Sequence, residues 1–220
     1  MTPDPVRTSA FETLTGTTGS DFPEYADPPA EPMALARRWA ESAARSGVRE
    51  PLALALATAD PHGRTSTRIV SVLEISAAGL LFATHTTSLK GRQIAETGWA
   101  SGLLYWRETA QQLSFSGPVA QIPGEQSDRL WDARAWQLHA MSTASRQSEV
   151  LDGAADVERL RDEAGRLLDR GAALPRPPAY AGYRLTPQNV EFWSAADDRL
   201  HRRLRYDRTA EGWQAVALQP

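Results

Sequence analysis

LALALATADPHGRTSTRIVSVLEI, residues 52–75, carries the clearest structural pattern in this chain. Its opening residues alternate between leucine and alanine, which is typical of a strand with one larger apolar face. The sequence Asp-Pro-His-Gly at 60–63 favours a tight turn. The β-branched run that follows, 65–75, predicts a returning strand, so the whole stretch predicts a β-hairpin.

Further strand patterns continue on the C-terminal side of this hairpin. We expect a strand at 79–84, a second hairpin from 101–108 and 111–122, and strands in YAGYRLTP, NVEFWS and LRYDR…GWQAVAL. Helical patterns occupy 31–47, 85–96, 123–136 and 156–171, and the last would present Val157, Leu160, Ala164, Leu167 and Leu168 on one face. The alternation of strand and helix typical of a parallel sheet is absent. The order therefore predicts a mainly β fold, an antiparallel barrel with peripheral helices.

Composition restricts the class of protein. The 220 residues carry a formal net charge of −3, which gives no general attraction to nucleic acid or to an anionic membrane. Cysteine is absent from the sequence, which excludes disulfides, a thiolate nucleophile and cysteine-bound metal. The four histidines are scattered without metal-ligand spacing, so we expect no metal site. With neither a secretory pattern nor an apolar run near the ~20 residues of a membrane helix, we expect a cytoplasmic protein.

The N-terminal residues differ from the rest of the chain. Residues 1–31 hold five prolines and six acids against one arginine. This composition predicts an extended arm, with plain disorder as the alternative. We expect a single domain to follow over 32–220.

Arg68 lies within the returning strand of the first hairpin, where its same-face neighbours are Val70 and Val72. A charged group beside apolar side chains needs a partner, because burying it alone is costly. Either Arg68 binds an anion, or it lies at the barrel rim and pairs with a carboxylate.

Hydroxyl side chains gather at the start of the helix expected over 85–96. Thr84, Thr86, Thr87 and Ser88 precede Lys90 and Arg92. Free N–H groups at a helix start favour an anion, and Lys90 would complete a phosphate site. Plain N-capping by Thr87 or Ser88 is the alternative.

Two adjacent glutamines, Gln111 and Gln112, lie on a predicted strand and must point to opposite faces. An inward-facing amide offers both a donor and an acceptor, which suits the edge of a flavin or an ordinary structural bond.

Five arginines fall within residues 199–208. On a strand, Arg199, His201 and Arg203 would share one face, which suggests recognition of phosphate or carboxylate. The alternatives are a solvated basic edge strand and, less favoured in this mildly acidic chain, a nucleic-acid patch.

Five segments together resemble one protein family. TRIVSVLE, LLFATHTTSLKGRQI, YWRETAQQ, SRQSE and VEFWSAADDRLHRRLRYDR…GW…LQP resemble the pyridoxamine 5′-phosphate oxidase family, in that family's order and from about residue 30 to the C-terminus. The segments LTGT…FPEY, WASGLLYWRETAQQ and MS…SRQSE look like its phenazine-biosynthesis branch in particular. The resemblance implies an FMN-binding split β-barrel that works as a homodimer, with FMN held between the two subunits.

The resemblance also implies which residues contact FMN. Arg68, Lys90 and the 84–88 loop would hold the phosphate, and Gln112 would reach the flavin ring. Four further contacts would come partly from the neighbouring subunit. The implied set is Arg68, Ile69, Thr84, Ser88, Lys90, Gln112, Gln147, Ser148, Trp193 and Arg203. The family's arginine beside this lysine is Leu89 here, which bears on how tightly the phosphate is held.

The substrate contacts that the resemblance implies are partly changed. Arg134, Arg199 and His201 match the family, and Arg199 and His201 are the candidates for a catalytic role. The vitamin enzymes carry lysine, tyrosine and serine at the positions of Leu73, Leu130 and Leu138. The pocket has thus lost polar anchors while keeping cations, and a bidentate arginine binds carboxylate as well as phosphate.

These changes favour a flat, largely apolar substrate that bears carboxylates. We therefore expect an FMN-dependent oxidase acting on partly reduced phenazine carboxylates with dioxygen. A pyridoxamine or pyridoxine 5′-phosphate oxidase and a non-catalytic flavin-binding barrel are the alternatives.

Overall fold

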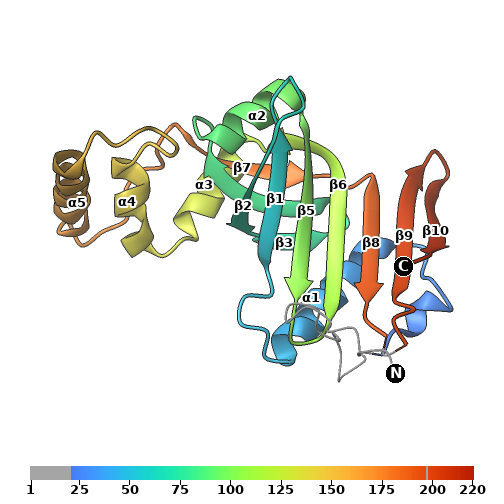
Figure 1. The fold of residues 1–220 in the computed structure, drawn as a ribbon. Helices are drawn as coiled ribbons and strands as arrows, with labels where there is room; N and C mark the ends of the chain where they lie inside the picture. Colours follow the sequence, from blue (N-terminus) through green and yellow to red (C-terminus); the bar gives the residue numbers. More distant parts are fainter. Residues whose placement is uncertain (1–20, 197) are drawn as a thin grey trace, which may run out of the picture.

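The computed structural model describes residues 21–196 and 198–220, which form a curled antiparallel sheet with helices around it (Figure 1). Its helices are η1 (Pro23–Tyr25), α1 (Pro32–Arg45), α2 (Leu89–Thr97), α3 (Gly124–Asp132), η2 (Trp136–Leu138), α4 (His139–Ala144) and α5 (Ala154–Leu168). Its strands are β1 (Ala53–Ala59), β2 (Thr65–Ser71), β3 (Glu74–Ser76), β4 (Gly79–His85), β5 (Trp99–Trp106), β6 (Gln111–Gln121), β7 (Tyr180–Leu185), β8 (Asn189–Ser194), β9 (Arg202–Thr209) and β10 (Gly212–Leu218).

The sheet runs in the order β10-β9-β8-β6-β5-β1-β2, and β3, β4 and β7 curl round from it. The long strand β6 joins the two parts, because residues 111–116 pair with β8 and residues 119–121 pair with β7. Gly117 lies at the change of partner, where a Cβ would come 2.2 Å from the Thr186 carbonyl oxygen. The predicted antiparallel barrel with peripheral helices is confirmed.

The first hairpin forms as predicted but ends earlier. β1 and β2 pair with Leu56 opposite Arg68, whereas the strand predicted over 65–75 is broken. The Val72 amide still donates to the Leu52 carbonyl, while the next amide, of Leu73, donates to Leu81 on β4. The prediction of one uninterrupted strand over 65–75 is therefore wrong, because the chain changes its partner strand after Val72.

The core lies between α1 and the inner face of the sheet. Leu54, Leu56, Leu104 and Leu113 are fully buried there, and Trp39 of α1 packs edge-on against Phe192. Phe22 is also buried against Trp39.

The predicted arm over 1–31 therefore meets the core before its expected end at residue 31. Within the described part of this arm, the short helix η1 forms at Pro23–Tyr25. Phe22 packs into the aromatic part of the core, which explains why the segment is held against the sheet. The remainder of that prediction, residues 1–20, lies outside the described residues.

The helices after β6 extend away from the barrel (Figure 1). The helix predicted over 123–136 ends at Asp132, and η2 and α4 follow it without having been predicted. α5 forms, but Ala164 is the one residue of its predicted apolar face that is buried, because α5 packs mainly on the short α4. Within the described part of the chain, no helix is long and apolar enough to cross a membrane.

Candidate functional site

Arg68 projects from β2 onto the inner face of the sheet, opposite Leu56. Its Nη1 donates to Thr58 Oγ1 at 2.6 Å, and its Nη2 donates to Ser66 Oγ at 2.6 Å. No carboxylate pairs with Arg68 among the residues that the structure describes. Burial lowers the pKa of its guanidinium, so the fold holds this cation at a cost. The alternative of a rim arginine paired with a carboxylate is wrong within the described chain.

Lys90 lies in the first turn of α2, close to Arg68. Its Nζ donates to Thr84 Oγ1 at 3.0 Å, to Ser88 Oγ at 3.4 Å and to Gln147 Oε1 at 3.3 Å. Burial, followed by the repulsion of Arg68, lowers the pKa of the Lys90 ammonium. The two cations therefore face a common region with neutral oxygens around them, which is the arrangement expected of an anion site.

Ser88 begins helix α2. Its side chain accepts the Gly91 amide at 3.2 Å, so the N-capping interpretation is confirmed for Ser88 and not for the exposed Thr87. The cap and the anion site are compatible, since Lys90 also reaches the Ser88 hydroxyl. Positive charge at a helix N-terminus adds to the attraction for an anion.

Gln147 and Ser148 lie beside this cluster in the same chain. Thr84 Oγ1 donates to Gln147 Oε1 at 3.2 Å, and the Leu89 amide donates to Ser148 Oγ at 3.0 Å. These two residues therefore reach the cluster within one chain, and the contribution of the neighbouring subunit to the four further contacts stays a prediction. They follow α4, and the loop after that helix brings them back to the start of α2.

A second group of predicted residues forms a row across three strands. Gln112 of β6 lies opposite Trp193 of β8, which lies opposite Arg203 of β9. Together with His201 they line a hollow of about 280 Å³. Glu191 accepts from Arg203 Nε at 2.7 Å, and this bond raises the pKa of the arginine. Gln112 is thus the glutamine on the outer face, and the buried Gln111 points inward.

The turn before β9 carries Arg199 and His201. β9 begins at Arg202, and Arg199 has a φ of 63°, so the prediction that Arg199, His201 and Arg203 share one strand face is wrong. His201 packs against Trp193 with ring centroids 4.8 Å apart, and its Nδ1 accepts the Ala196 amide at 3.2 Å. A neutral His201 therefore carries its proton on Nε2, where it is a hydrogen-bond donor.

Two groups of site residues lie on opposite faces of the sheet. Arg68, Lys90 and their hydroxyl partners form the inner cluster, and Gln112, Trp193 and Arg203 form the outer row. Arg68 shares the inner face with Leu56, whereas Gln112 shares the outer face with Tyr105, and Ile69 is exposed on that outer face. Strands β5 and β1 also separate β6 from β2, a distance of about 14 Å at the usual strand spacing. A ligand that contacted both groups within a single chain would have to pass around the edge of the sheet at β2.

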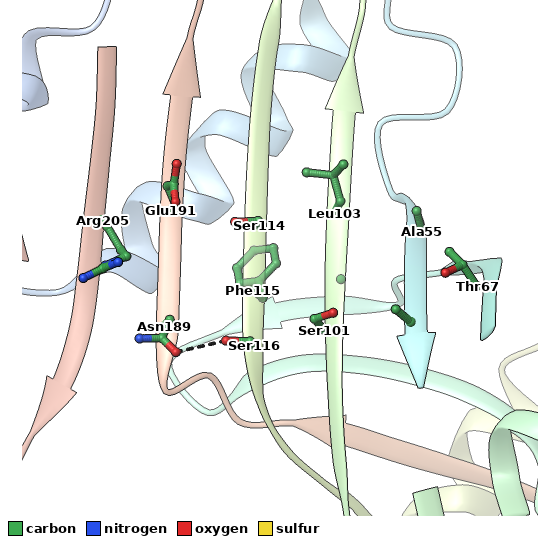
Figure 2. Close-up of a pocket in the computed structure, with 12 residues that line it drawn as sticks. Ala55, Thr67, Ser101, Leu103, Ser114, Phe115, Ser116, Asn189, Glu191 and Arg205 are labelled. Carbon is green, nitrogen blue, oxygen red and sulfur yellow. Dashed lines mark hydrogen bonds between the residues drawn. The ribbon is translucent and has the colours of Figure 1, made fainter. Parts of the chain in front are cut away.

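The outer face between these strands is hollowed, with about 610 Å³ lined largely by small side chains (Figure 2). Ala55, Ser101 and Ser114 face it from adjacent strands, with Glu191 and Arg205 at one side (Figure 2). This surface is open and lacks convergent cations apart from Arg205. It suits contact with another protein surface better than a phosphate.

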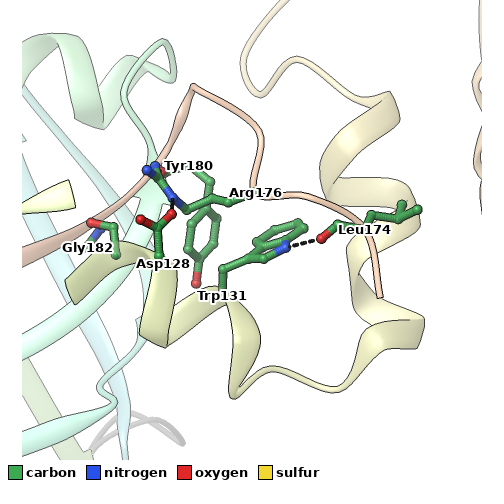
Figure 3. Close-up of polar contacts among 7 residues, drawn as sticks. Asp128, Trp131, Leu174, Arg176, Tyr180 and Gly182 are labelled. Atoms are coloured by element: carbon green, nitrogen blue, oxygen red, sulfur yellow. Dashed lines mark hydrogen bonds and ion pairs between the residues drawn. The ribbon is translucent and has the colours of Figure 1, made fainter. Parts of the chain in front are cut away.

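Arg134 follows helix α3, beside an aromatic cluster. Its Nη1 donates to Ser142 Oγ at 2.8 Å, and its guanidinium lies 6.0 Å from the ring centres of Trp131 and Tyr180. Trp131 is fixed by a bond to the Leu174 carbonyl at 2.6 Å, and Arg176 ties the loop to Asp128 (Figure 3). Arg134 therefore has a defined position and no carboxylate partner within the described residues.

Three leucines stand where the vitamin enzymes carry polar residues, and they lie on different elements of the fold. Leu73 and Leu138 are about half exposed, and Leu130 packs toward Gly182 on β7. Leu130 lies on α3, Leu138 on η2 and Arg134 in the turn between these helices, whereas Arg199 and His201 lie in the turn before β9. The predicted substrate residues thus also divide into two groups in one chain.

Residues that sequence reasoning missed complete the inner cluster. Gln93 of α2 accepts from both Thr58 and Ser66, the two hydroxyls that hold Arg68. The signal available in the sequence was a glutamine three residues after Lys90 on a helix. Trp131 and Tyr180 beside Arg134 had no such signal, because their contact joins segments about fifty residues apart.

The curled antiparallel sheet with helices around it, and the paired cations at a helix start, define a protein of the split-barrel class with a candidate anion site. Residues 40–194 match the pyridoxamine 5′-phosphate oxidase family, and residues 180–220 match the pyridoxine 5′-phosphate oxidase C-terminal dimerisation region. The chain belongs to the pyridoxamine 5′-phosphate oxidase family of enzymes.

Individual relatives cover nearly the whole chain. A dihydrophenazinedicarboxylate synthase of Burkholderia lata is 53% identical over 98% of this chain and 100% of its own length. A pyridoxine/pyridoxamine 5′-phosphate oxidase of Rubrobacter xylanophilus is 38% identical over 89% of this chain and 88% of its own. The solved structure of PhzG from Burkholderia lata 383, in complex with tetrahydrophenazine-1-carboxylic acid, is 52% identical, with a TM-score of 0.89 over 93% of this chain and 100% of that one. A pyridoxamine 5′-phosphate oxidase-related, FMN binding protein from Nostoc punctiforme shares the fold at 20% identity, with a TM-score of 0.67 over 86% of this chain and 98% of that one.

Proposed function

We propose that this protein is an FMN-dependent oxidase of phenazine biosynthesis that acts on partly reduced phenazine carboxylates. The observation that carries the proposal is the pair of half-buried cations, Arg68 and Lys90, which face one region without a carboxylate among the described residues. A ligand phosphate would supply the missing negative charge. The hydroxyls of Thr84 and Ser88 supply further polar contacts for it.

The outer row fits the other end of the same cofactor. The Gln112 amide offers a donor and an acceptor for the flavin edge, and Trp193 offers an aromatic face. Because the two groups lie on opposite faces of one chain, the complete site would combine the inner cluster of one subunit with the outer row of its partner. The C-terminal match to a dimerisation region supports this homodimer.

Bound FMN would supply a two-electron acceptor, with dioxygen regenerating its oxidised form and releasing hydrogen peroxide. The residues of this chain bind and orient the substrate. Arg134 and Arg199 would hold carboxylates, and His201 would donate a hydrogen bond through Nε2, because Ala196 occupies Nδ1. The leucines at 73, 130 and 138 would provide apolar walls for a flat ring system. The names of the Burkholderia lata relatives support this class of substrate.

Steady-state turnover with two substrate classes tests the proposal. We expect hydrogen peroxide release and FMN reduction with a partly reduced phenazine-1-carboxylate, and a much slower reaction with pyridoxine 5′-phosphate. Leaving a buried phosphate oxygen unpaired costs about 1–3 kcal/mol per group, so several missing polar partners predict discrimination of orders of magnitude. Efficient oxidation of pyridoxine 5′-phosphate would favour the vitamin-enzyme alternative instead. A protein that binds FMN but oxidises neither class would support the non-catalytic barrel.

A further inference from the structure

Arg68 is held by a network of neutral groups that converges on one buried side chain, Gln93. Thr58 Oγ1 donates to Gln93 Oε1 at 2.6 Å, and Ser66 Oγ donates to the same oxygen at 2.8 Å. These are the two hydroxyl oxygens that accept the Arg68 Nη1 and Nη2 hydrogens, both at 2.6 Å. Both nitrogens of the guanidinium fork are thus connected through a hydroxyl to one amide oxygen.

The bonds in this network run in one consistent direction. A guanidinium only donates, so both hydroxyl oxygens must accept from Arg68. Each hydroxyl then has its own hydrogen left to donate, and the structure places the Gln93 carbonyl oxygen as the acceptor of both. The Gln93 side chain is buried, with a relative exposure of 6%.

Gln93 also connects the two halves of the inner cluster. It lies on α2 one turn after Lys90, whereas Thr58 and Ser66 lie on β1 and β2. The network therefore sets the position of the hairpin cation relative to the helix cation. A carboxylate in place of the Gln93 amide could accept the same two hydrogen bonds. Its negative charge would, however, offset the positive charge of Arg68 and so weaken the attraction of Arg68 for an anion.

We propose that Gln93 is a positioning residue, which fixes the Arg68 guanidinium through Thr58 and Ser66 while leaving its positive charge free for the cofactor phosphate. This inference rests on the proposed function, because it assumes that the anion at Arg68 is the phosphate of FMN. It adds that the amide is required for its neutrality as well as for its shape.

Two substitutions separate neutrality from shape. Gln93→Glu keeps the size and both acceptor bonds but adds a negative charge, and Gln93→Leu removes the acceptor. The full-length apoprotein of each variant is titrated with FMN and, separately, with riboflavin, which lacks the phosphate. The ratio of the two dissociation constants reports the phosphate contact alone.

We expect Gln93→Glu to fold at least as stably as the unaltered chain and yet to lose about tenfold or more in FMN affinity, with riboflavin affinity unchanged. Gln93→Leu should also weaken FMN selectively, and its apoprotein should be less stable, because two buried hydroxyls lose their acceptor. Ala95→Glu is the matched control: it places the same charge on an exposed position of the same helix and should change the ratio by less than about twofold.

The outcomes separate this inference from the proposed function. If the unaltered protein binds FMN no better than riboflavin, the phosphate assignment itself fails. If the unaltered protein prefers FMN strongly and Gln93→Glu keeps that preference, then Gln93 is merely structural and the inference is overturned. Equal loss of preference in Ala95→Glu would show a general charge effect and would overturn it as well.

Discussion

Replacing Lys90 by methionine removes the ammonium of the inner cluster while keeping most of the side-chain volume. In the structure this ammonium donates to Thr84, Ser88 and Gln147, and no carboxylate among the described residues neutralises it. Burial and Arg68 both disfavour its charge. Lys90→Met should therefore weaken the FMN complex much more than it lowers the stability of the apoprotein.

The magnitude follows from the contacts that Lys90 would make. A hydrogen bond to a charged group contributes about 1.5–3 kcal/mol, and each 1.4 kcal/mol is tenfold in affinity, so FMN binding should weaken about ten- to a hundredfold. The apoprotein should lose little stability or gain some, because the mutual repulsion of Arg68 and Lys90 disappears while three neutral oxygens lose a donor. A lysine with a purely structural role would give the reverse result, a less stable apoprotein with unchanged affinity.

The assay is quenching of flavin fluorescence in titrations of apoprotein with FMN and with riboflavin. Riboflavin affinity should be the same in Lys90→Met and the unaltered chain, since it has no phosphate. Arg92→Met is the matched control, because Arg92 is an exposed cation on the same helix whose partner is the Thr87 carbonyl. A parallel loss of riboflavin affinity, or an equal loss of FMN affinity in Arg92→Met, would refute the assignment of Lys90 to the phosphate.

Three further predictions concern pH, substrate preference and packing. Folding lowers the pKa of Lys90 from its ordinary 10.5, so the unfolded chain holds this proton more tightly than the folded chain. The free energy of unfolding of the apoprotein should therefore rise with pH as the pH approaches 10.5 from below. Urea unfolding should show this rise in the unaltered chain and not in Lys90→Met, and an equal dependence on pH in both would contradict the prediction. Restoring polar groups in the triple variant Leu73→Lys, Leu130→Tyr, Leu138→Ser should raise turnover of pyridoxine 5′-phosphate and lower that of phenazine carboxylates, measured as kcat/KM; no shift in the ratio would show that these positions do not select the substrate. Gly117→Ala should lower the free energy of unfolding in denaturant by about 1–3 kcal/mol, because the new Cβ would meet the Thr186 carbonyl. Gly165→Ala in α5, where the space around the Cβ is open, should raise it by about 0.5–1 kcal/mol. Similar effects at both sites would contradict the packing argument.

Local pattern was sufficient for most elements of the barrel. The alternation at 52–58 and the paired strands 101–108 and 111–122 appear in the structure with small changes at their ends. The break after Ser71 could not be predicted, because Val72 and Leu73 continue the same apolar pattern while their amides bond to different strands. Residues that change partner strand look like any other strand residues when the partners are unknown.

The site was predictable only in part for the same reason. Lys90 and Ser88 are close in sequence, so their convergence at a helix start could be argued from spacing. The placement of Arg68 beside them depends on the pairing of β2 with β1 and on α2 lying over that hairpin, which spacing does not reveal. The strand assumed for Arg199 failed because a turn with a positive φ precedes β9. Gln147 illustrates the remaining difficulty, since a loop after an unpredicted helix carries it to Lys90.

A mixed dimer tests most directly the central claim that FMN lies between the inner cluster of one subunit and the outer row of the other. One chain carries Arg68→Ala with Lys90→Met, the other carries Gln112→Ala with Arg203→Ala, and the mixed dimer is purified through two different tags. Each parent homodimer then has two damaged sites, whereas the mixed dimer has one intact site and one site damaged on both sides. We predict that the mixed dimer binds one FMN with the affinity of the unaltered protein and that neither parent binds it tightly. A mixed dimer that binds FMN no better than its parents would contradict the shared site.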